Sequence, residues 1–247
     1  MKITFLGTSH GIPSETRFCS AALLETGGRA YLFDAGAPVA DLLIRRGVPF
    51  TALCAIFTTH IHADHTLGLL PLVSLCNWKY KETSFDIFLT EDEGVEAFRR
   101  VVDVTDGGFA ADRLRFRKTV PGVFYADDRI TVTAIPTRHM EHQNGRPSYA
   151  YLIDAEGKRV VFTGDLHWGD AADFPRQAME YPSETIVCES AHFAPATVLP
   201  YLLRCPTKRI LFNHVAFNYD ESMAAIREAA KTEPRITAVE DGDVIEL

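Results

Sequence analysis

The segment that most constrains this chain is the motif His-x-His-x-Asp-His at residues 60–65, directly after a short apolar run at residues 53–57. A continuous apolar run bounded by polar residues is typical of a strand buried on both faces. In α/β proteins, functional residues gather where such strands end. In an extended loop, positions i and i+2 point the same way, so His60 and His62 can converge on one metal ion. Asp64 and His65, where the chain turns into a helix, can bind a second ion beside the first.

Three more ligand-type residues stand at the ends of predicted strands: His139, Asp165 and His214. One histidine in such a place is more often a surface or core residue, but four strand-end ligand groups in one chain favour a metal centre. Neutral imidazoles and carboxylates suit two divalent ions, zinc above all and manganese or iron with less preference. The alternative is a solvated histidine cluster or a tag remnant, which would lie at a terminus and give Asp64 no purpose.

Composition sets the broad class. The chain has 247 residues, of which 47% are hydrophobic and 23% charged, enough for one sizeable core, and we expect a single domain over residues 1–247. The net charge of −8 disfavours a broad surface for nucleic acid or anionic membrane. Five scattered cysteines without a CxxC pair indicate reduced thiols. With no signal peptide and no apolar run of about 18 residues, we expect a cytoplasmic protein that is not in a membrane.

Hydrophobic periodicity predicts alternating strands and helices. The predicted strands are residues 3–6, 21–25, 30–33, 53–57, 87–90, 130–135, 149–153, 160–163, 186–188 and 209–212, with two short ones near the C-terminus. The predicted helices are residues 39–46, 67–76, 91–104, 196–203 and 222–231. Strand-rich halves, each finished by helices, indicate an α/β layered domain.

The ordered ligand set resembles the metallo-β-lactamase superfamily. This resemblance implies a four-layer αββα sandwich with two metal ions. It also implies the distribution of ligands: one ion held by His60, His62 and His139, the other by Asp64, His65 and His214, with Asp165 bridging the two.

Three segments are similar to the ribonuclease Z-like branch of that superfamily: FLGTSHGIP at residues 5–13, THIHADHTLGL at 59–69 and SYAY at 148–151. In that branch a glutamate segment and a downstream histidine assist catalysis. The nearest match here is CESAHF at residues 188–193, so His192 would protonate the leaving oxygen and Glu189 would orient it. A capping or surface role is the alternative for His192.

Only 26 positions separate His139 from Asp165. The members of the branch that process transfer RNA carry a long protruding arm there, for which this chain has no room. Large nucleic acid is therefore an improbable substrate, and the chain is more similar to the compact phosphodiesterase associated with carbon–phosphorus lyase. The cysteine-bound structural zinc of that relative is not evident, because Cys19 stands alone in the opening loop.

The expected function is a binuclear metal-dependent hydrolase that cleaves a small anionic phosphodiester, for example a cyclic nucleotide, through a metal-bridging hydroxide. Asp64 would also accept the proton of the attacking water. Arg17 and Arg138 are candidates for contact with the phosphate, with plain surface solvation as the alternative. Specificity is expected from the loops at residues 8–18, 77–84 and 141–147.

Three alternatives stay open. The same metal pair can hydrolyse carboxylic esters, lactones or thioesters, although the 33 residues after His214 are few for the helical region of the thioester hydrolases. A ribonuclease Z-type endonuclease is the second alternative. A metal-binding sensor without turnover is less favoured, because a structural zinc site closes with four ligands. The family resemblance further implies a homodimer.

Overall fold

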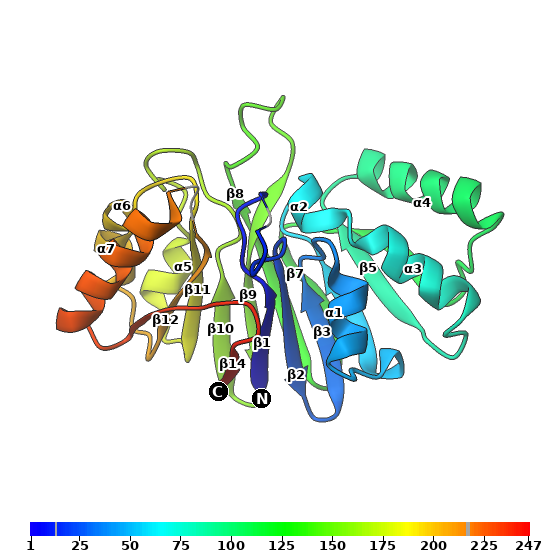
Figure 1. Ribbon diagram of the computed structural model, residues 1–247, viewed down its shortest axis with the longest axis horizontal. Helices are drawn as coiled ribbons and strands as arrows, with labels where there is room; N and C mark the ends of the chain where they lie inside the picture. Colours follow the sequence, from blue (N-terminus) through cyan, green and yellow to red (C-terminus); the bar gives the residue numbers. More distant parts are fainter. Residues whose placement is uncertain (13, 216–217) are drawn as a thin grey trace.

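Two seven-stranded mixed sheets face each other at the centre of the molecule, counted over the described residues 1–12, 14–215 and 218–247 of the computed structural model (Figure 1). The first sheet has the order β14-β1-β2-β3-β4-β5-β6 and the second the order β13-β12-β11-β10-β9-β8-β7. Both termini lie at the same end of the molecule, because β1 pairs antiparallel with β14.

The strands are β1 (Lys2–Gly7), β2 (Ala21–Thr26), β3 (Arg29–Phe33), β4 (Leu53–Phe57), β5 (Phe85–Leu89), β6 (Leu114–Lys118), β7 (Gly122–Ala126), β8 (Ile130–Thr137), β9 (Ser148–Ala155), β10 (Lys158–Phe162), β11 (Thr185–Ser190), β12 (Ile210–Val215), β13 (Ile236–Ala238) and β14 (Val244–Glu246). The helices are α1 (Val39–Arg45), α2 (Ala63–Thr66), α3 (Leu69–Trp78), α4 (Asp92–Asp106), α5 (Arg176–Glu180), α6 (Pro195–Leu202) and α7 (Tyr219–Thr232), with a 3₁₀ turn at Phe50–Ala52.

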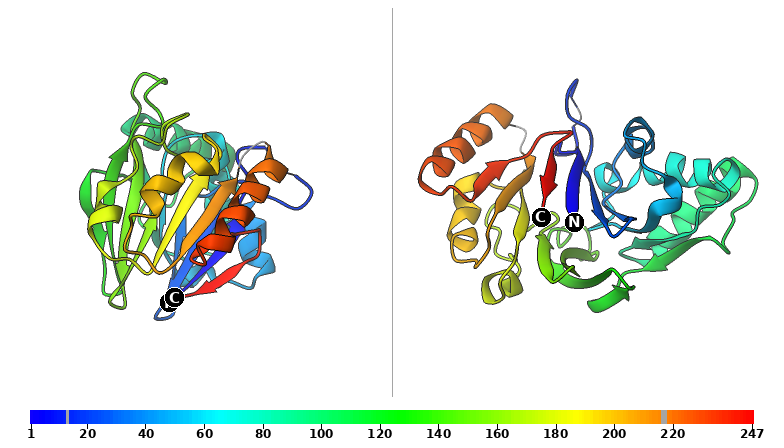
Figure 2. Two further views of the ribbon diagram at one scale, coloured as in Figure 1. Left: turned by 90° about the vertical axis from the view of Figure 1, so that its left-hand side faces the viewer. Right: turned by 90° about the horizontal axis from the view of Figure 1, so that it is seen from below.

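The helices cover the two outer faces of the paired sheets (Figure 2). Helices α1, α3 and α4 pack on the first sheet, and α5, α6 and α7 pack on the second. Strand β3 shows how one sequence serves two layers: Ala30 and Leu32 face the helices, whereas Tyr31 and Phe33 face the opposite sheet. This alternation follows from the two-residue period of a strand. The αββα sandwich expected from the sequence is confirmed.

Aromatic side chains fill the space between the sheets. The ring of Phe57, at the end of β4, is fully buried and lies 5.1 Å from Phe33, 5.4 Å from Phe88 and 6.2 Å from Tyr151, measured between centroids. Phe57 stands three positions before His60, the first residue of the metal-ligand motif. Its packing therefore fixes the position from which the motif leaves the sheet.

The structure differs from the sequence prediction in the start of one helix, in several additional elements and in the length of β12. The helix predicted at residues 67–76 is α3, which begins two residues later at Leu69, and a separate short helix that was not predicted, α2, precedes it. Gly68 between them sits against the backbone, since a Cβ there would lie 2.6 Å from the carbonyl oxygen of Ala35. Helix α5 and the strands β6 and β7 were not predicted. Strand β6 is at an edge of its sheet and alternates apolar with basic residues, so its signal is weak. His214 lies inside β12, because this strand extends to Val215, whereas the predicted strand ended at residue 212.

No helix in the described part of the chain is long and apolar enough to cross a membrane.

Replacing Phe57 by alanine should lower the free energy of unfolding by about 3–5 kcal/mol, because it removes a fully buried ring and leaves a cavity between the sheets. The measurement is urea unfolding in the presence of a chelator, so that metal binding does not contribute. The control is Val104→Ala on α4, where the side chain is 69% exposed and a change within about 0.5 kcal/mol is expected. A loss below 1 kcal/mol for Phe57→Ala would contradict this account of the core.

Candidate metal centre

The candidate ligands meet at one edge of the two sheets, in the upper part of Figure 1. Strands β10, β11 and β12 are parallel, and β8 runs in the same direction because it is antiparallel to β9, which is antiparallel to β10. Their carboxyl ends therefore reach the same edge, together with that of β4. The ligand-type residues come from the β4–α2 loop (His60, His62), α2 (Asp64, His65), the end of β8 (His139), the end of β10 (Asp165) and β12 (His214).

Three imidazoles form the first group. Nδ1 of His62 lies 2.9 Å from Nε2 of His60 and 3.2 Å from Nε2 of His139. Burial lowers the pKa of each of these histidines. The rings are therefore neutral at pH 7, which is the form that binds metal.

The second group combines two imidazoles and a carboxylate. Oδ2 of Asp64 lies 3.3 Å from Nε2 of His65 and 3.8 Å from Nε2 of His214. Nε2 of His65 is buried and has no hydrogen-bond partner among the described residues. A buried nitrogen without a partner is costly unless something else binds it.

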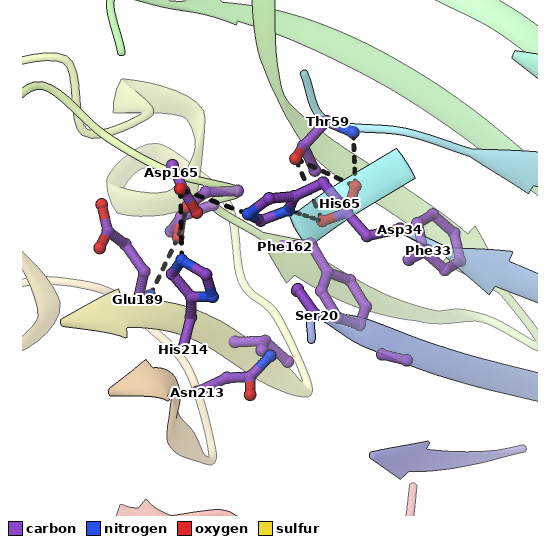
Figure 3. A pocket seen from close by; sticks show the side chains of 14 residues that line it. Ser20, Phe33, Asp34, Thr59, His65, Phe162, Asp165, Glu189, Asn213 and His214 are labelled. Carbon is purple, nitrogen blue, oxygen red and sulfur yellow. Dashed lines mark hydrogen bonds and ion pairs between the residues drawn. The ribbon is translucent and has the colours of Figure 1, made fainter. Parts of the chain in front are cut away.

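Asp165 lies between the two groups, and Figure 3 shows it beside His65 and His214 of the second group. Its Oδ2 is 3.3 Å from Nε2 of His214 and 3.4 Å from Nε2 of His65, and it is 3.7 Å from Nε2 of both His60 and His139. Burial opposes ionisation of this carboxyl, but His214 and His65 outweigh burial and hold its pKa well below the usual value. One anionic oxygen is thus shared by histidines from both groups.

These distances fit two divalent cations. Ligand atoms about 2.1 Å from a tetrahedral ion lie about 3.4 Å from one another, close to the separations within each group. The cluster is mostly buried and combines imidazoles with carboxylates, which balance cationic charge. The sequence expectation of a two-ion site is consistent with this geometry.

A second set of contacts orients the candidate ligands. Asp34 stands just after β3, and its Oδ2 is 2.8 Å from Nδ1 of His65 (Figure 3). Its Oδ1 accepts a hydrogen bond from the backbone N–H of Thr59 at 2.7 Å. Nδ1 of His139 donates to the carbonyl of Leu166 at 3.2 Å. Such contacts fix the ring orientation and raise the basicity of the ligating nitrogen.

Gly164 lets Asp165 reach its place. Its φ is +57°, and a Cβ there would lie 2.8 Å from the carbonyl oxygen of Tyr149 and 2.9 Å from Cβ of Thr59. Both the positive φ and this close approach require glycine. The turn after β10 is thereby pressed against the β4 loop, which brings the two sheets together at the site.

The structure also brings Glu189 and His192 to the cluster. Nδ1 of His192 lies 2.9 Å from Oε2 of Glu189, and the His192 ring is 4.5 Å from the His139 ring between centroids. Glu189 is buried at the end of β11 and accepts the backbone N–H of Leu166 at 2.7 Å. Burial disfavours the charged form of His192, but Glu189 and Asp165 outweigh it and raise its pKa to about 9.

Arg17 and Arg138, the two candidates for contact with a phosphate, have different surroundings. Arg17 donates through Nε and Nη2 to Thr8, and its guanidinium stacks on Tyr219 at 4.3 Å, so it stabilises the opening loop. Arg138 is half exposed, and its guanidinium lies 3.7 Å from Glu141. The geometry gives Arg17 a structural task, and it leaves Arg138 as a candidate for contact with a phosphate.

Sequence reasoning missed Asp34, Gln143 and Trp168. Asp34 directly follows a predicted strand, so the strand-end rule could have found it. The side-chain amide of Gln143 lies 2.6 Å from Nε2 of His62, and nothing in the local sequence indicates this contact. The ring of Trp168 lies 5.2 Å from the ring of His192, measured between centroids.

The fold and this buried histidine–aspartate cluster define a metal-dependent hydrolase of the metallo-β-lactamase fold, in its ribonuclease Z-like branch. The family described as "Anti-Pycsar protein Apyc1" matches residues 1–191, and the chain belongs to that family. The branch expected from the sequence is thus confirmed.

Curated relatives are similar over part of their length. A ribonuclease Z of Picosynechococcus sp. is 33% identical over 219 residues, which cover 77% of this chain and 68% of that protein. A ribonuclease Z of Shouchella clausii is 32% identical over 161 residues, covering 64% of this chain and 49% of the relative. The chain spans about half the length of most of these relatives.

Solved structures share the fold at low sequence identity. The short form of human tRNase Z superposes with a TM-score of 0.77 at 20% identity, covering 100% of this chain and 99% of that one. The metallo-β-lactamase-fold protein YhfI of Bacillus subtilis gives 0.79 at 20% identity, with the same coverage.

Asp34→Asn should weaken zinc binding about 10- to 100-fold, because it removes the charge beside Nδ1 of His65 while keeping the size of the side chain. Competition with a chromogenic chelator measures the affinity. The control is Asp154→Asn, whose carboxylate pairs with Arg159 at the surface. Equal affinities in the two variants would show that Asp34 does not support the site.

Proposed function

We propose that the protein is a binuclear metal-dependent phosphodiesterase that hydrolyses a small anionic phosphodiester, with cyclic nucleotides as the first substrate class to test. The observation that carries the proposal is the position of Oδ2 of Asp165 between the two groups of candidate ligands. Two cations that share a ligand suit displacement at phosphorus, where charge develops on both the attacking and the leaving oxygen. The name of the curated relatives, ribonuclease Z, denotes enzymes that cleave phosphodiester bonds, which supports this chemistry.

The residues that would hold one cation are His60, His62 and His139, and those that would hold the other are Asp64, His65 and His214. Asp165 would serve both cations, because its Oδ2 lies within 3.7 Å of histidines from both sets. The nitrogen-rich donor set favours zinc over manganese or iron. When bound, two such cations lower the pKa of water and neutralise negative charge on a phosphodiester.

His192 and Glu189 act on the leaving group. Nδ1 of His192 faces Glu189, which leaves Nε2 as the atom that delivers a proton to the departing alkoxide. The carboxylates beside this ring raise its pKa, and bound cations act in the opposite direction, which brings the value back towards neutrality. Asp64, whose Oδ2 lies 3.3 Å from Nε2 of His65, would accept the proton of the attacking water.

The fold favours a small substrate. The β8–β9 loop, β9 and β10 occupy the whole segment between His139 and Asp165 and leave no residues for an RNA-binding arm. The net charge of −8 also disfavours a long polyanion. We propose further that residues 1–247 act as one hydrolase domain, that it works as a homodimer, and that it resides in the reducing cytoplasm, where its five free cysteines stay reduced.

The zinc-loaded protein should hydrolyse cyclic mononucleotides and bis(p-nitrophenyl) phosphate, and a chelator or Asp165→Ala should abolish both activities. A panel of phosphodiester, carboxylic ester, lactone and precursor-tRNA substrates separates the alternatives. Turnover of esters or lactones only would refute the phosphodiesterase assignment. Turnover of precursor tRNA only would favour a ribonuclease Z-type endonuclease, and turnover of none a binding protein.

His192→Ala should lower kcat by about 10²- to 10⁴-fold for a cyclic nucleotide, whose leaving group is a poor alkoxide. The loss should be much smaller for bis(p-nitrophenyl) phosphate, because nitrophenolate departs without protonation. Metal content, measured by elemental analysis, should stay at two ions per chain. Equal losses on both substrates would instead indicate that His192 only supports the site.

A further inference from the structure

Trp168 is the most exposed of the large aromatic side chains near the metal centre, with 68% of its surface accessible. It stands three positions after Asp165, and hydrogen bonds hold its loop on both sides of the tryptophan. The N–H of Gly169 donates to the carbonyl of His192 at 3.0 Å, and the N–H of His167 donates to Asp173 at 2.8 Å. An exposed indole on a well-anchored backbone contributes little to the core and is available to a ligand.

The indole lies beside the group proposed to protonate the leaving oxygen. Its ring centroid is 5.2 Å from that of His192, at an interplanar angle of 66°. Trp168 borders a surface pocket of about 480 Å³, whose wall consists of His139, Glu141, His142, His167 and Trp168. Because His139 belongs both to this wall and to the first ligand group, the pocket opens directly beside the metal centre.

We infer that Trp168 is a specificity-determining platform on which the planar base of a nucleotide substrate stacks. This inference rests on the proposed phosphodiesterase function and names the group that the substrate carries next to its phosphate. The phosphate of the substrate would lie at the two ligand groups, and its leaving oxygen would lie at His192. Because Trp168 is beside His192, the rest of the substrate would then extend over the indole. Stacking on an indole face recognises any flat π system, and the polar groups of Glu141 and His142 lie within the same pocket to meet the edge of a base.

A kinetic comparison isolates the contribution of the base. The substrates are 3′,5′-cyclic AMP and the matching 1-deoxyribose cyclic phosphate, which has the same reacting phosphodiester and no base. Trp168→Ala should lower the ratio of kcat/KM values for the nucleotide over the abasic substrate roughly 5- to 100-fold, mainly through KM, and Trp168→Phe should restore most of it. Equal losses on both substrates would overturn the inference, because Trp168 would then only support His192.

Fluorescence gives a readout that does not depend on turnover. The chain has two tryptophans, so Trp78→Phe leaves Trp168 as the only indole. Trp78 ends α3 and is 60% exposed, which makes the change tolerable for the fold. In zinc-loaded Trp78→Phe protein, adenosine 5′-monophosphate should quench the emission saturably, and ribose 5-phosphate should not. The same quenching by both ligands, or by neither, would overturn the inference.

The two proposals fail in distinguishable ways. If the wild-type enzyme hydrolyses neither cyclic substrate nor bis(p-nitrophenyl) phosphate, the phosphodiesterase function is refuted, whereas base-dependent quenching of Trp168 would still support a nucleotide platform. If the enzyme hydrolyses both with the same kcat/KM and Trp168→Ala changes nothing, the function stands and the platform is refuted.

Discussion

The anionic oxygen that Asp165 places among four imidazole nitrogens is the interaction on which the rest of the site depends. Its Oδ2 lies 3.3–3.7 Å from Nε2 of histidines that belong to both ligand groups. A buried carboxylate is stable only with compensating positive charge, and His214 and His65 supply part of it, since they hold the pKa of Asp165 well below its usual value. The buried histidine–aspartate cluster is consistent with a binuclear metal site, in which the shared oxygen would lie between the two cations.

The fold brings this oxygen to its position by joining the sheets at their carboxyl edge. Asp165 comes from the second sheet, whereas His60 and Asp34 come from the first. Gly164 allows the two loops to touch, and the aromatic layer beneath, with Phe57 at its centre, sets the distance between the sheets. Stability and metal binding are consequently linked, because the packing that separates the sheets also separates the ligands.

Hydrogen bonds connect the residues proposed to contact the substrate with the candidate metal ligands. Buried Glu189 accepts from the backbone of Leu166 and faces the ring of His192, while Leu166 in turn accepts from His139. The backbone of His192 then holds the loop that carries Trp168. A change in the position of a ligand would therefore move the proton donor and the aromatic platform together, which keeps the phosphate, the leaving oxygen and the base in a fixed relation.

The sequence by itself determined the ligand motif and the layered fold. A strand buried on both faces has a distinct apolar run, and the i, i+2 geometry that follows it makes His60 and His62 converge without help from the rest of the chain. Edge strand β6 was missed because its alternating arginines resemble an exposed loop as much as a strand. Only the tertiary structure decided that His139, 77 positions from His62, lies 3.2 Å from it. It also decided that Asp34 supports His65, that Arg17 stabilises a loop, and that Trp168 borders the site. Such contacts join residues from different strands and loops, and their distances depend on sheet order and loop packing, which local periodicity does not encode.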